Sequence, residues 1–375
     1  MGIISEKARA GLLRLIRQGK FNATNMLPSE QALAEMLGIS RTPLRVAIEE
    51  LIAEGIIQRN GKRGCFLLGK GVKLASPMRD SIVFISDYIA DQRSFNRCYP
   101  GDIQAGLFAS ALSKGYNYFV IQNVKNLSPS SSVNWFLGNP PLAVIPSNYI
   151  SHNKNNVPAL IKLKNAGIHV IASGNPPFLS EFNRVAANQE KGAYILTTHF
   201  IARGCRDIRM LYLPQDKEVY WLQERARGYQ QAMKEAGLGS GKFFPEHSVK
   251  SRPKENTDLD SYLSWLAGVI ATTIMNEGLP EAILVYSDSY CPTIGMAFDI
   301  IEKGIATRPL IGGFDGYWSE IETEENAKYK PVATVDTKPH KQGAMMIEML
   351  EEAIAGELQE PTVRFCEPEL VILDE

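Results

Sequence analysis

Two arginines four residues apart, Arg41 and Arg45, stand with Thr42 in the segment SRTPLRVAIEEL. A guanidinium group can fork to O6 and N7 of guanine or neutralise a phosphate, and a threonine hydroxyl can bond to either kind of group. These residue types at this spacing predict contacts with a polyanion. Double-stranded DNA is the expected partner.

The elements that must position these side chains are indicated by the same stretch. In LPSEQALAEMLG, Ser29 is expected to cap a helix that Gly38 ends. A second helix should follow, with Pro43 in its first turn, where backbone N–H groups have no helical partner. Its apolar stripe excludes Arg41 and Arg45. Two helices joined by a turn of about three residues predict a helix-turn-helix, whose second helix enters a major groove.

A basic turn follows the two helices. The stretch IIQRNGKRGCFLL predicts two short strands around a glycine-rich turn. Lys62 and Arg63 lie between Gly61 and Gly64, and such a basic tip can reach a phosphate or a minor groove. Basic hairpins are common, but one that directly follows a helix-turn-helix is interpreted as a wing.

The first 70 residues resemble the GntR-type winged helix-turn-helix. The resemblance rests on LPSE, on LAEMLGISRTPLRVAIEELIAEGII and on GKRGCFLL. It implies DNA contacts from the start of the second helix and from the wing, at Arg41, Thr42, Arg45, Arg63 and Gly64, and a phosphate contact from Ser29. Cys65 departs from the pattern, which more often has threonine there.

The rest of the chain alternates short apolar runs with helical stretches. SIVFIS, NYFVIQ, LAVIP, HVIAS, IRMLYL, AILVYS and LIGGF are expected to be strands, and GDIQAGLFASALSKG and GYQQAMKEAG helices. This alternation predicts an α/β fold with mostly parallel strands, and the number of runs indicates two sheets.

This larger part resembles the effector domain of LacI/GalR regulators. The resemblance rests on NRVAANQEKGAYILTTHFIARGCRDIRMLYLP, ERARGYQQAMKEAGL, PEAILVYSDSYCPTIGMAFDIIEKGI, PLIGGFDGYW and PVATVDTKPHKQGAMMIEMLEEAIAG. It implies two periplasmic-binding-protein-like lobes with a ligand between them. The expected division is a winged domain at 1–70, a linker at 71–79, one lobe at about 80–186 and 331–350, and another at about 187–330 and 351–375. Such a pairing is similar to the arabinose-repressor architecture.

The resemblance also implies ligand contacts. Arg225, three residues before Gly228, and Asp315 in GGFD stand where the family has ligand-binding residues. Asp288 follows an expected strand, where open sheets place ligand groups. The polar and aromatic loop SDYIADQRSFNRCYPGD could bind ligand or be solvated, and any one aromatic residue could instead pack in the core. Candidate effector-binding residues are therefore Asp87, Tyr88, Phe95, Asn188, Trp221, Arg225, Asp288 and Asp315.

One departure affects the identity of the ligand. Ala187 stands where the family usually has aspartate, which leaves Asn188 as the polar residue of that pair. The effector therefore cannot be copied from a relative. A sugar-like ligand fits forked donors, carboxylate acceptors and flat aromatic rings.

Composition limits the remaining possibilities. Residues 1–70 carry eleven Lys and Arg against six Asp and Glu, whereas the chain as a whole has a net charge of -1. The five cysteines and five histidines are scattered, so neither a metal site nor a cofactor is expected. No apolar run is long enough for a membrane span, and charges interrupt the start MGIISEKARAGLLRLIRQGK, so we expect no membrane partner and a cytoplasmic location.

Together these patterns predict a regulator of transcription. We expect a homodimeric repressor whose affinity for operator DNA is controlled by a small carbohydrate effector. The alternatives are a solute-binding protein, or a carbohydrate-processing enzyme on a related scaffold. The sequence contains no nucleophile elbow, dinucleotide fingerprint or metalloprotease motif, so no catalytic residue is assigned.

Overall fold

A computed structural model describes most of the 375 residues. The described residues are 8–9, 11–13, 15–16, 20–21, 26–53, 56–61, 64–67, 78–86, 99–122, 124, 127, 132–212, 218–244, 259–301, 308–358 and 361–374. Five of the predicted site residues lie outside them: Lys62, Arg63, Asp87, Tyr88 and Phe95. Most of the expected linker, 71–77, also lies outside them.

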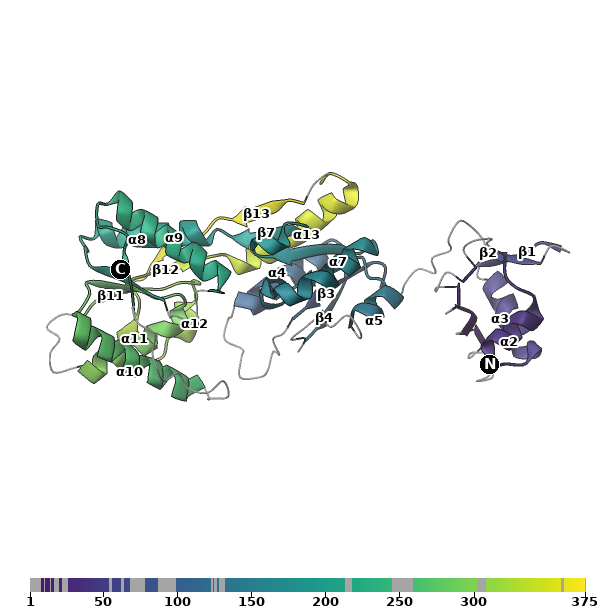
Figure 1. The fold of residues 1–375 in the computed structure, drawn as a ribbon, viewed down its shortest axis with the longest axis horizontal. Helices are drawn as coiled ribbons and strands as arrows, with labels where there is room; N and C mark the ends of the chain where they lie inside the picture. Colours follow the sequence, from purple (N-terminus) through teal and green to yellow (C-terminus); the bar gives the residue numbers. More distant parts are fainter. Residues whose placement is uncertain are drawn as a thin grey trace.

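The N-terminal module contains the two predicted helices, α2 (Glu30–Leu37) and α3 (Arg41–Ala53). The Ser29 hydroxyl accepts a hydrogen bond from the Ala32 amide at 3.2 Å, and Gly38 ends α2 with a φ of 63°, as predicted. Pro43 is the third residue of α3. Strands β1 (Ile57–Arg59) and β2 (Cys65–Leu67) pair antiparallel, and Figure 1 shows them above α2 and α3 as part of one body.

The first lobe is built on a six-stranded sheet in which every described pairing is parallel. Its strands, in spatial order, are β13 (Val363–Cys366), β7 (Asn183–Ala187), β6 (His169–Ser173), β5 (Ala143–Pro146), β3 (Ser81–Ile85) and β4 (Asn117–Ile121). Alternate residues of β3 face opposite sides, so that Phe84 and Val83 belong to different apolar clusters. Because both faces are covered, the strand reads as a continuous apolar run.

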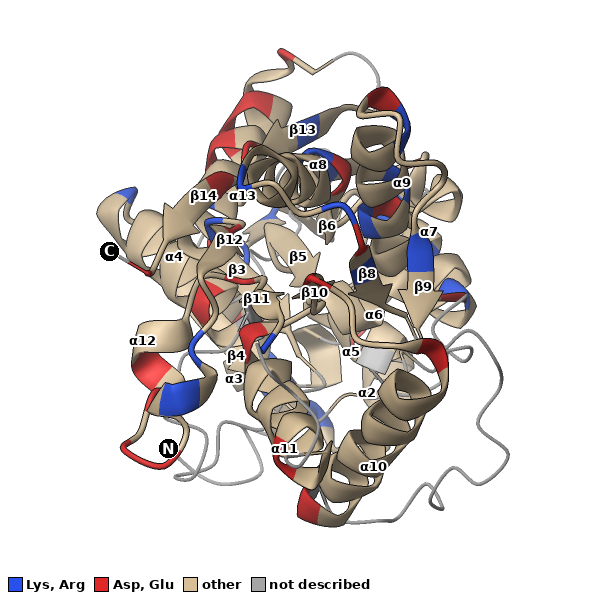
Figure 2. Cartoon of the chain, turned by 90° about the vertical axis from the view of Figure 1, so that its left-hand side faces the viewer, with Lys and Arg blue, Asp and Glu red and all other residues tan. Residues whose placement is uncertain are grey.

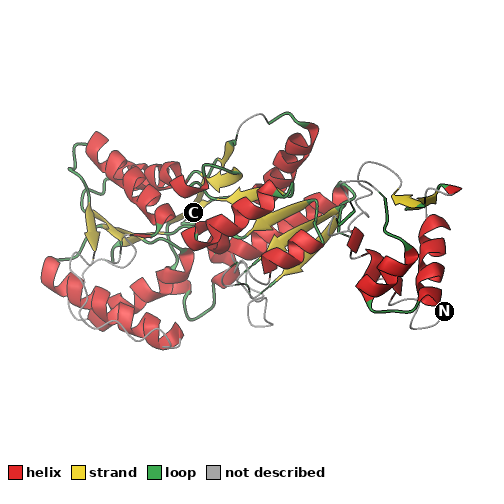
Figure 3. Ribbon diagram, turned by 45° about the vertical axis from the view of Figure 1, so that its right-hand side comes forward, coloured by secondary structure: helices red, strands yellow, loops and turns green. Residues whose placement is uncertain are grey.

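Helices cover both faces of this sheet. Helices α4 (Tyr99–Ser113) and α13 (Pro339–Ala355) pack together on one face, where Leu107 and Ile347 join the cluster around Phe84. The other face is covered by α5 (Ser132–Gly138), α6 (Asn148–His152) and α7 (Val157–Asn165). Figure 3 shows the yellow strands between red helices.

The second lobe has a sheet of the same design. Its strands, in spatial order, are β14 (Glu369–Ile372), β12 (Ala333–Asp336), β11 (Leu310–Gly312), β10 (Ala282–Leu284), β8 (Ile208–Leu211) and β9 (Lys242–Phe244). Only β14 is antiparallel among the pairings described in this sheet. The seven apolar runs predicted to be strands all form strands, and the α/β fold with parallel sheets is confirmed.

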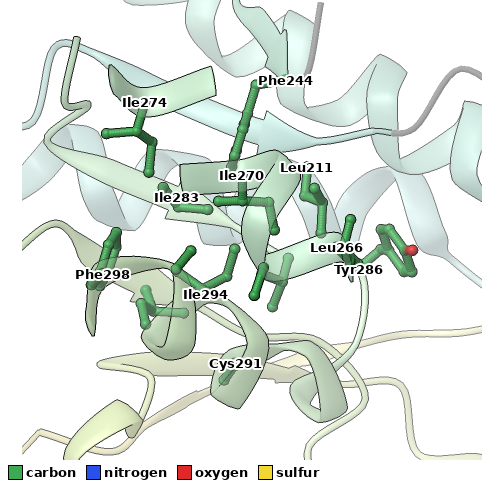
Figure 4. Close-up of a cluster of buried hydrophobic side chains, with 14 of the residues drawn as sticks. Leu211, Phe244, Leu266, Ile270, Ile274, Ile283, Tyr286, Cys291, Ile294 and Phe298 are labelled. Atoms are coloured by element: carbon green, nitrogen blue, oxygen red, sulfur yellow. The ribbon is translucent and has the colours of Figure 1, made fainter. Parts of the chain in front are cut away.

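Two helix layers enclose the second sheet. Helices α8 (Gln189–Ala202) and α9 (Tyr220–Glu235) pack on one face, and α10 (Leu259–Glu277) and α11 (Cys291–Ile301) on the other. Figure 4 shows side chains of α10, including Leu266 and Ile270, meeting Leu211 and Ile283 from the strands. Shorter segments complete the lobe: α12 (Trp318–Ile321), η5 (Asp288–Tyr290) and η6 (Ala327–Tyr329).

The chain passes between the two lobes three times, after β7, after β12 and after β13. The expected lobe boundaries were therefore partly wrong. Strand β12 falls within 331–350, which was assigned to the first lobe, but it pairs in the second sheet. Strand β13 falls within 351–375, which was assigned to the second lobe, but it pairs with β7 in the first. The chain crosses between the lobes within a few residues after β12 and again after β13, so strands that are close in sequence pair in different sheets.

None of the helices in the described ranges combines the length and apolar character needed to cross a membrane.

The contact between α8 and α9 yields a first prediction. A Cβ atom at Gly228 would lie 1.9 Å from the Glu190 carbonyl oxygen, whereas one at Gly268 in α10 would meet nothing within 4 Å. Gly228→Ala should lower the free energy of unfolding by about 1–3 kcal/mol because two helix backbones must move apart. Gly268→Ala, the matched control, should raise it by about 0.5–1 kcal/mol. Urea denaturation checks both, and equal effects of the two substitutions would contradict this packing.

Candidate functional sites

A cleft of about 340 Å³ lies between the lobes. Its lining comes from segments that follow the carboxyl ends of strands in both sheets: α6 after β5, the end of β6, α9 after β8, and the turns after β10 and β11. Parallel α/β sheets place ligand sites at these ends. Two sheets that share one cleft can therefore hold a small molecule from two sides.

Among the described residues, those that line the cleft from the first lobe carry no charge. Asn148 and His152 come from α6, Ser173 ends β6, and Asn175 follows it. Burial lowers the pKa of His152 to about 4, against a smaller opposite effect of its hydrogen bond to the Ser173 backbone. The His152 ring is therefore neutral at pH 7, and this wall offers amide, hydroxyl and imidazole groups.

The second-lobe wall is organised around the buried Arg225 on α9. Its Nε donates to the Gln189 side-chain oxygen at 2.7 Å, its Nη1 to the Tyr286 carbonyl, and its Nη2 to Asp315 at 3.3 Å. The guanidinium also lies 3.6 Å from the ring centroid of Phe314. An arginine held by three acceptors and an aromatic face is fixed in direction, as a binding site requires.

A second cluster lies beneath this wall. Asp288 is fully buried, accepts hydrogen bonds from the Thr334 hydroxyl at 2.7 Å and the Tyr317 amide at 2.9 Å, and does not line the cleft. Burial raises the pKa of Asp288 to about 7, and the charge of Asp315 acts in the same direction. The Tyr317 hydroxyl bonds to Ser287 at 2.7 Å and donates to Asp315 at 3.3 Å. Asp288 thus holds the loop that carries Asp315 and Tyr317.

Aromatic rings and one further carboxylate complete the cleft. Tyr220, Trp221, Tyr286 and Tyr290 line it from the second lobe. Glu224 accepts a hydrogen bond from the Tyr220 hydroxyl at 2.9 Å, and burial raises the pKa of Glu224. Flat rings beside hydrogen-bonding groups suit a ligand with apolar ring faces and polar edges. Among the described residues, no cluster of three or more His, Cys, Asp and Glu could hold a metal ion.

The predicted effector residues divide into four groups. Trp221, Arg225 and Asp315 line the cleft together. Asp288 supports it from below, and Asn188 lies elsewhere: its side chain caps α8 through the Lys191 amide and donates to Glu367 at 3.3 Å. Asn188 is not among the residues that line the cleft, because it stands in the first chain crossing, where it contacts the third, and its role in binding the effector stays a prediction. The remaining three, Asp87, Tyr88 and Phe95, lie outside the described residues.

Sequence reasoning missed several residues of the cleft. His152 and Asn148 were passed over because a scattered histidine or asparagine has no motif. Their position in the sequence could have indicated them, since NYISH begins only two residues after the end of the expected strand LAVIP. Glu224 adjoins Arg225, and Tyr317 stands two residues after Asp315, so both could have been found by proximity.

The start of α3 forms the second candidate site. Arg41, Thr42 and Arg45 are exposed on one end of the helix, while Leu44 and Ala47 are buried beneath them. Arg45 Nε lies 2.6 Å from a Glu30 carboxylate oxygen, in an exposed ion pair. Such a pair is worth at most about 1 kcal/mol, so a phosphate could replace Glu30 at little cost.

Two further predicted residues flank this site. Ser29 is exposed at the start of α2, where its hydroxyl already caps the helix. Gly64 has a φ of 95°, and its carbonyl accepts a hydrogen bond from the Asn60 amide at 2.9 Å. This positive φ explains the glycine, because other residues adopt it only with strain.

Comparison with known protein families agrees with this architecture. Residues 4–67 match the family model of bacterial regulatory proteins of the gntR family, and residues 197–307 match a periplasmic binding protein-like domain. The chain joins a GntR-type helix-turn-helix to a periplasmic-binding-protein-like domain. This GntR-type and binding-protein-like pairing confirms the resemblance seen in the sequence.

Individual proteins show the same likeness. The HTH-type transcriptional repressor PurR of Vibrio atlanticus is 28% identical over 201 residues, which is 52% of this chain and 53% of the relative. The chain therefore spans about half the length of the curated relatives it matches. The transcriptional regulator CelR in complex with cellobiose has a TM-score of 0.59 at 17% identity, covering 92% of this chain and 99% of that one. A LacI-family regulatory protein of Chloroflexus aggregans has a TM-score of 0.57 at 20% identity, covering 78% and 98%.

The raised pKa of Asp288 yields a prediction about pH. In the unfolded chain the Asp288 carboxyl ionises near its ordinary pKa of 3.8, whereas in the folded protein it keeps its proton up to about pH 7. Because the folded state binds the proton more tightly, the free energy of unfolding falls as the pH rises between these two values. An asparagine keeps an acceptor oxygen for the Tyr317 amide, its amide nitrogen can donate to the Thr334 hydroxyl oxygen, and it stays neutral at every pH. Asp288→Asn should therefore raise the free energy of unfolding relative to wild type more at pH 8 than at pH 5.

Asp207 provides the matched control for this measurement. The hydrogen bond from Arg209 lowers the pKa of Asp207, so neither its folded nor its unfolded form titrates between pH 5 and pH 8. Asp207→Asn should change stability by the same amount at both pH values. Urea denaturation at pH 5 and pH 8 measures both variants, and a pH-independent effect of Asp288→Asn would contradict the assignment.

Proposed function

We propose that the chain is a transcription regulator that binds double-stranded operator DNA and responds to a small carbohydrate held between its lobes. The observation that carries the proposal is the presence, in one chain, of an exposed Arg41–Thr42–Arg45 face and a two-lobed ligand cleft. The first can read base edges or phosphates, and the second can sense a small molecule.

Three observations support a carbohydrate as the effector. The cleft combines aromatic faces with hydroxyl, amide and carboxylate groups, which suits a polyhydroxylated ring. The fold resembles that of a regulator whose structure holds cellobiose. Arg225 and Asp315 were both predicted to bind the effector, and Arg225 Nη2 lies 3.3 Å from Asp315 Oδ1 on the second-lobe wall.

Repression is the proposed direction of control. The relative with 28% identity is named as a repressor, and a protein that occupies an operator can block transcription. The ligand acts by changing the relative population of lobe arrangements with different DNA affinity, and a coupling of about 1–3 kcal/mol shifts that affinity roughly 5- to 150-fold. We place this activity in the cytoplasm, the compartment that holds operator DNA.

The proposed working form is a homodimer, because two helix-turn-helix modules on one assembly can meet two half-sites. Exposed apolar side chains on neighbouring elements of the first lobe support it. Leu112 on α4 is 61% exposed, and Phe108 on α4 and Phe119 on β4 are each 49% exposed. Sedimentation velocity at micromolar concentration should find a dimer, and a monomer alone would contradict this part of the proposal.

Removal of two charges tests the DNA-binding face. Arg41→Ala/Arg45→Ala should weaken binding to a fragment upstream of the protein's own gene, by about 1–3 kcal/mol for each lost base contact. The slope of log K against log salt should shrink by about 0.9 for each lost phosphate contact. Fluorescence anisotropy over a salt series measures both quantities.

Arg203→Ala is the control for this experiment. It removes one exposed charge from the second lobe, where Arg203 pairs with Asp374, and should leave DNA binding unchanged. Binding by the double variant that matches wild type at every salt concentration would refute the role of α3. Figure 2 shows Lys and Arg in blue and Asp and Glu in red on the described part of the chain.

A further inference from the structure

Two hydrogen-bond acceptors on α6 have no partner among the described residues. Asn148 Oδ1 and His152 Nε2 are both buried, and both side chains belong to the lining of the cleft. They stand four residues apart, on one face of the helix. A buried polar atom left without a partner costs about 1–3 kcal/mol, so these two atoms favour a ligand that brings donors.

The surroundings of His152 fix its role as an acceptor. One ring nitrogen of His152 forms a hydrogen bond with the Ser173 backbone. In a neutral ring the other nitrogen, Nε2, then carries the lone pair and can accept a hydrogen bond. The ring lies against Gly174, where a Cβ atom would be only 2.0 Å from Nε2. A side chain at position 174 would displace the His152 ring, so Gly174 keeps the space that the ring occupies.

The opposite wall also presents acceptors. Asp315 and Glu224 bring carboxylates to the cleft, and Arg225 is the only Lys or Arg among the described residues that line it. The Arg225 guanidinium is already engaged by Gln189, by the Tyr286 carbonyl and by Asp315. Its charge is balanced within the protein and does not call for an anion from the ligand.

We propose that the cleft takes an uncharged, hydroxyl-rich ligand, a free mono- or disaccharide, and rejects the phosphate ester and the carboxylic acid of the same sugar. This inference rests on the proposed function and specifies its ligand class. Sugar hydroxyls can donate to Asn148, His152 and the carboxylates of the second lobe. An ionised phosphate or carboxylate offers acceptors only, and would lie near Asp315 and Glu224 with like charge.

The discrimination has two physical sources. An anionic group placed against α6 has no donor for Asn148 Oδ1 or His152 Nε2, and one placed against the second lobe is repelled by Asp315 and Glu224. Sites built to bond a hydroxyl reject analogues that leave their buried polar groups unpaired far more strongly than apolar pockets reject a change in size. His152 and Asn148 are therefore specificity-determining residues of the first lobe.

Binding to the full-length protein tests the ligand class. The probes are D-glucose, D-galactose, D-ribose and cellobiose, with glucose 6-phosphate, glucuronate, galactose 6-phosphate, ribose 5-phosphate and cellobionate as charged counterparts. At least one free sugar should raise the melting temperature, since a ligand that binds the folded state stabilises it. Isothermal titration should give its charged counterpart a Kd higher by roughly tenfold or more.

Two outcomes would overturn the ligand class: a charged counterpart that binds as tightly as the free sugar, or binding by none of the free sugars. DNA binding over a salt series, measured on the same preparation, distinguishes a wrong ligand class from a wrong proposed function. Retained DNA binding without sugar binding rejects the ligand class alone. Absence of DNA binding rejects the proposed function as a DNA-binding regulator.

Substitution of the histidine tests the residue assignment. His152→Leu should raise the Kd for the sugar that binds by roughly tenfold or more, because one donor of the ligand loses its acceptor. His199→Leu is the matched control, since His199 Nε2 on α8 is also buried without a partner but does not line the cleft. It should leave the Kd unchanged.

A second variant keeps the test decisive if His152→Leu does not fold. Asn148→Leu removes the other unpaired acceptor from the same helix face, and it should weaken sugar binding in the same direction. Wild-type sugar affinity in every folded variant of the pair would contradict the assignment.

Discussion

The three chain crossings between the lobes are the constraint on which the rest of the larger domain depends. Each crossing leaves one sheet and enters the other lobe within a few residues, so the two sheets face each other with their carboxyl ends toward one cleft. The crossings also bond to one another: the Asn188 amide donates to the Cys366 carbonyl at 3.1 Å, and Lys338 pairs with Glu369 at 2.7 Å. A hinge of short bonded segments can let the lobes move while it keeps them facing each other.

The two walls of the cleft differ in chemistry in a way that suits this hinge. In the described lining the charged groups belong to the second lobe, and Arg225 and Asp315 are fixed there by hydrogen bonds that exist without a ligand. The described residues of the first-lobe wall contribute neutral groups, and Asn148 Oδ1 and His152 Nε2 have no partner among the described residues. A preorganised wall can bind the ligand first at low entropic cost, and the neutral wall then gains its bonds when the lobes approach.

The sequence was sufficient for the features that depend on local pattern. Apolar runs predicted the strands, because a strand in a sheet covered on both faces is apolar throughout. Ser29 and Gly38 predicted the ends of α2, because capping is a local interaction. The features that failed depend on contacts distant in sequence. Strands β12 and β13 were assigned to the wrong lobes, since nothing local tells a strand which sheet it joins. Likewise, only the fold places Asn188 in the hinge and Asp288 beneath the cleft.

The proposed function requires coupling between the ligand cleft and the DNA-binding face, and coupling between two binding sites is reciprocal. Its most direct test is the sugar affinity of the full-length protein, measured by titration with and without saturating operator DNA. The account predicts that DNA changes the sugar Kd by the same factor by which the sugar changes the DNA Kd. A sugar Kd that is identical with and without bound DNA would contradict it.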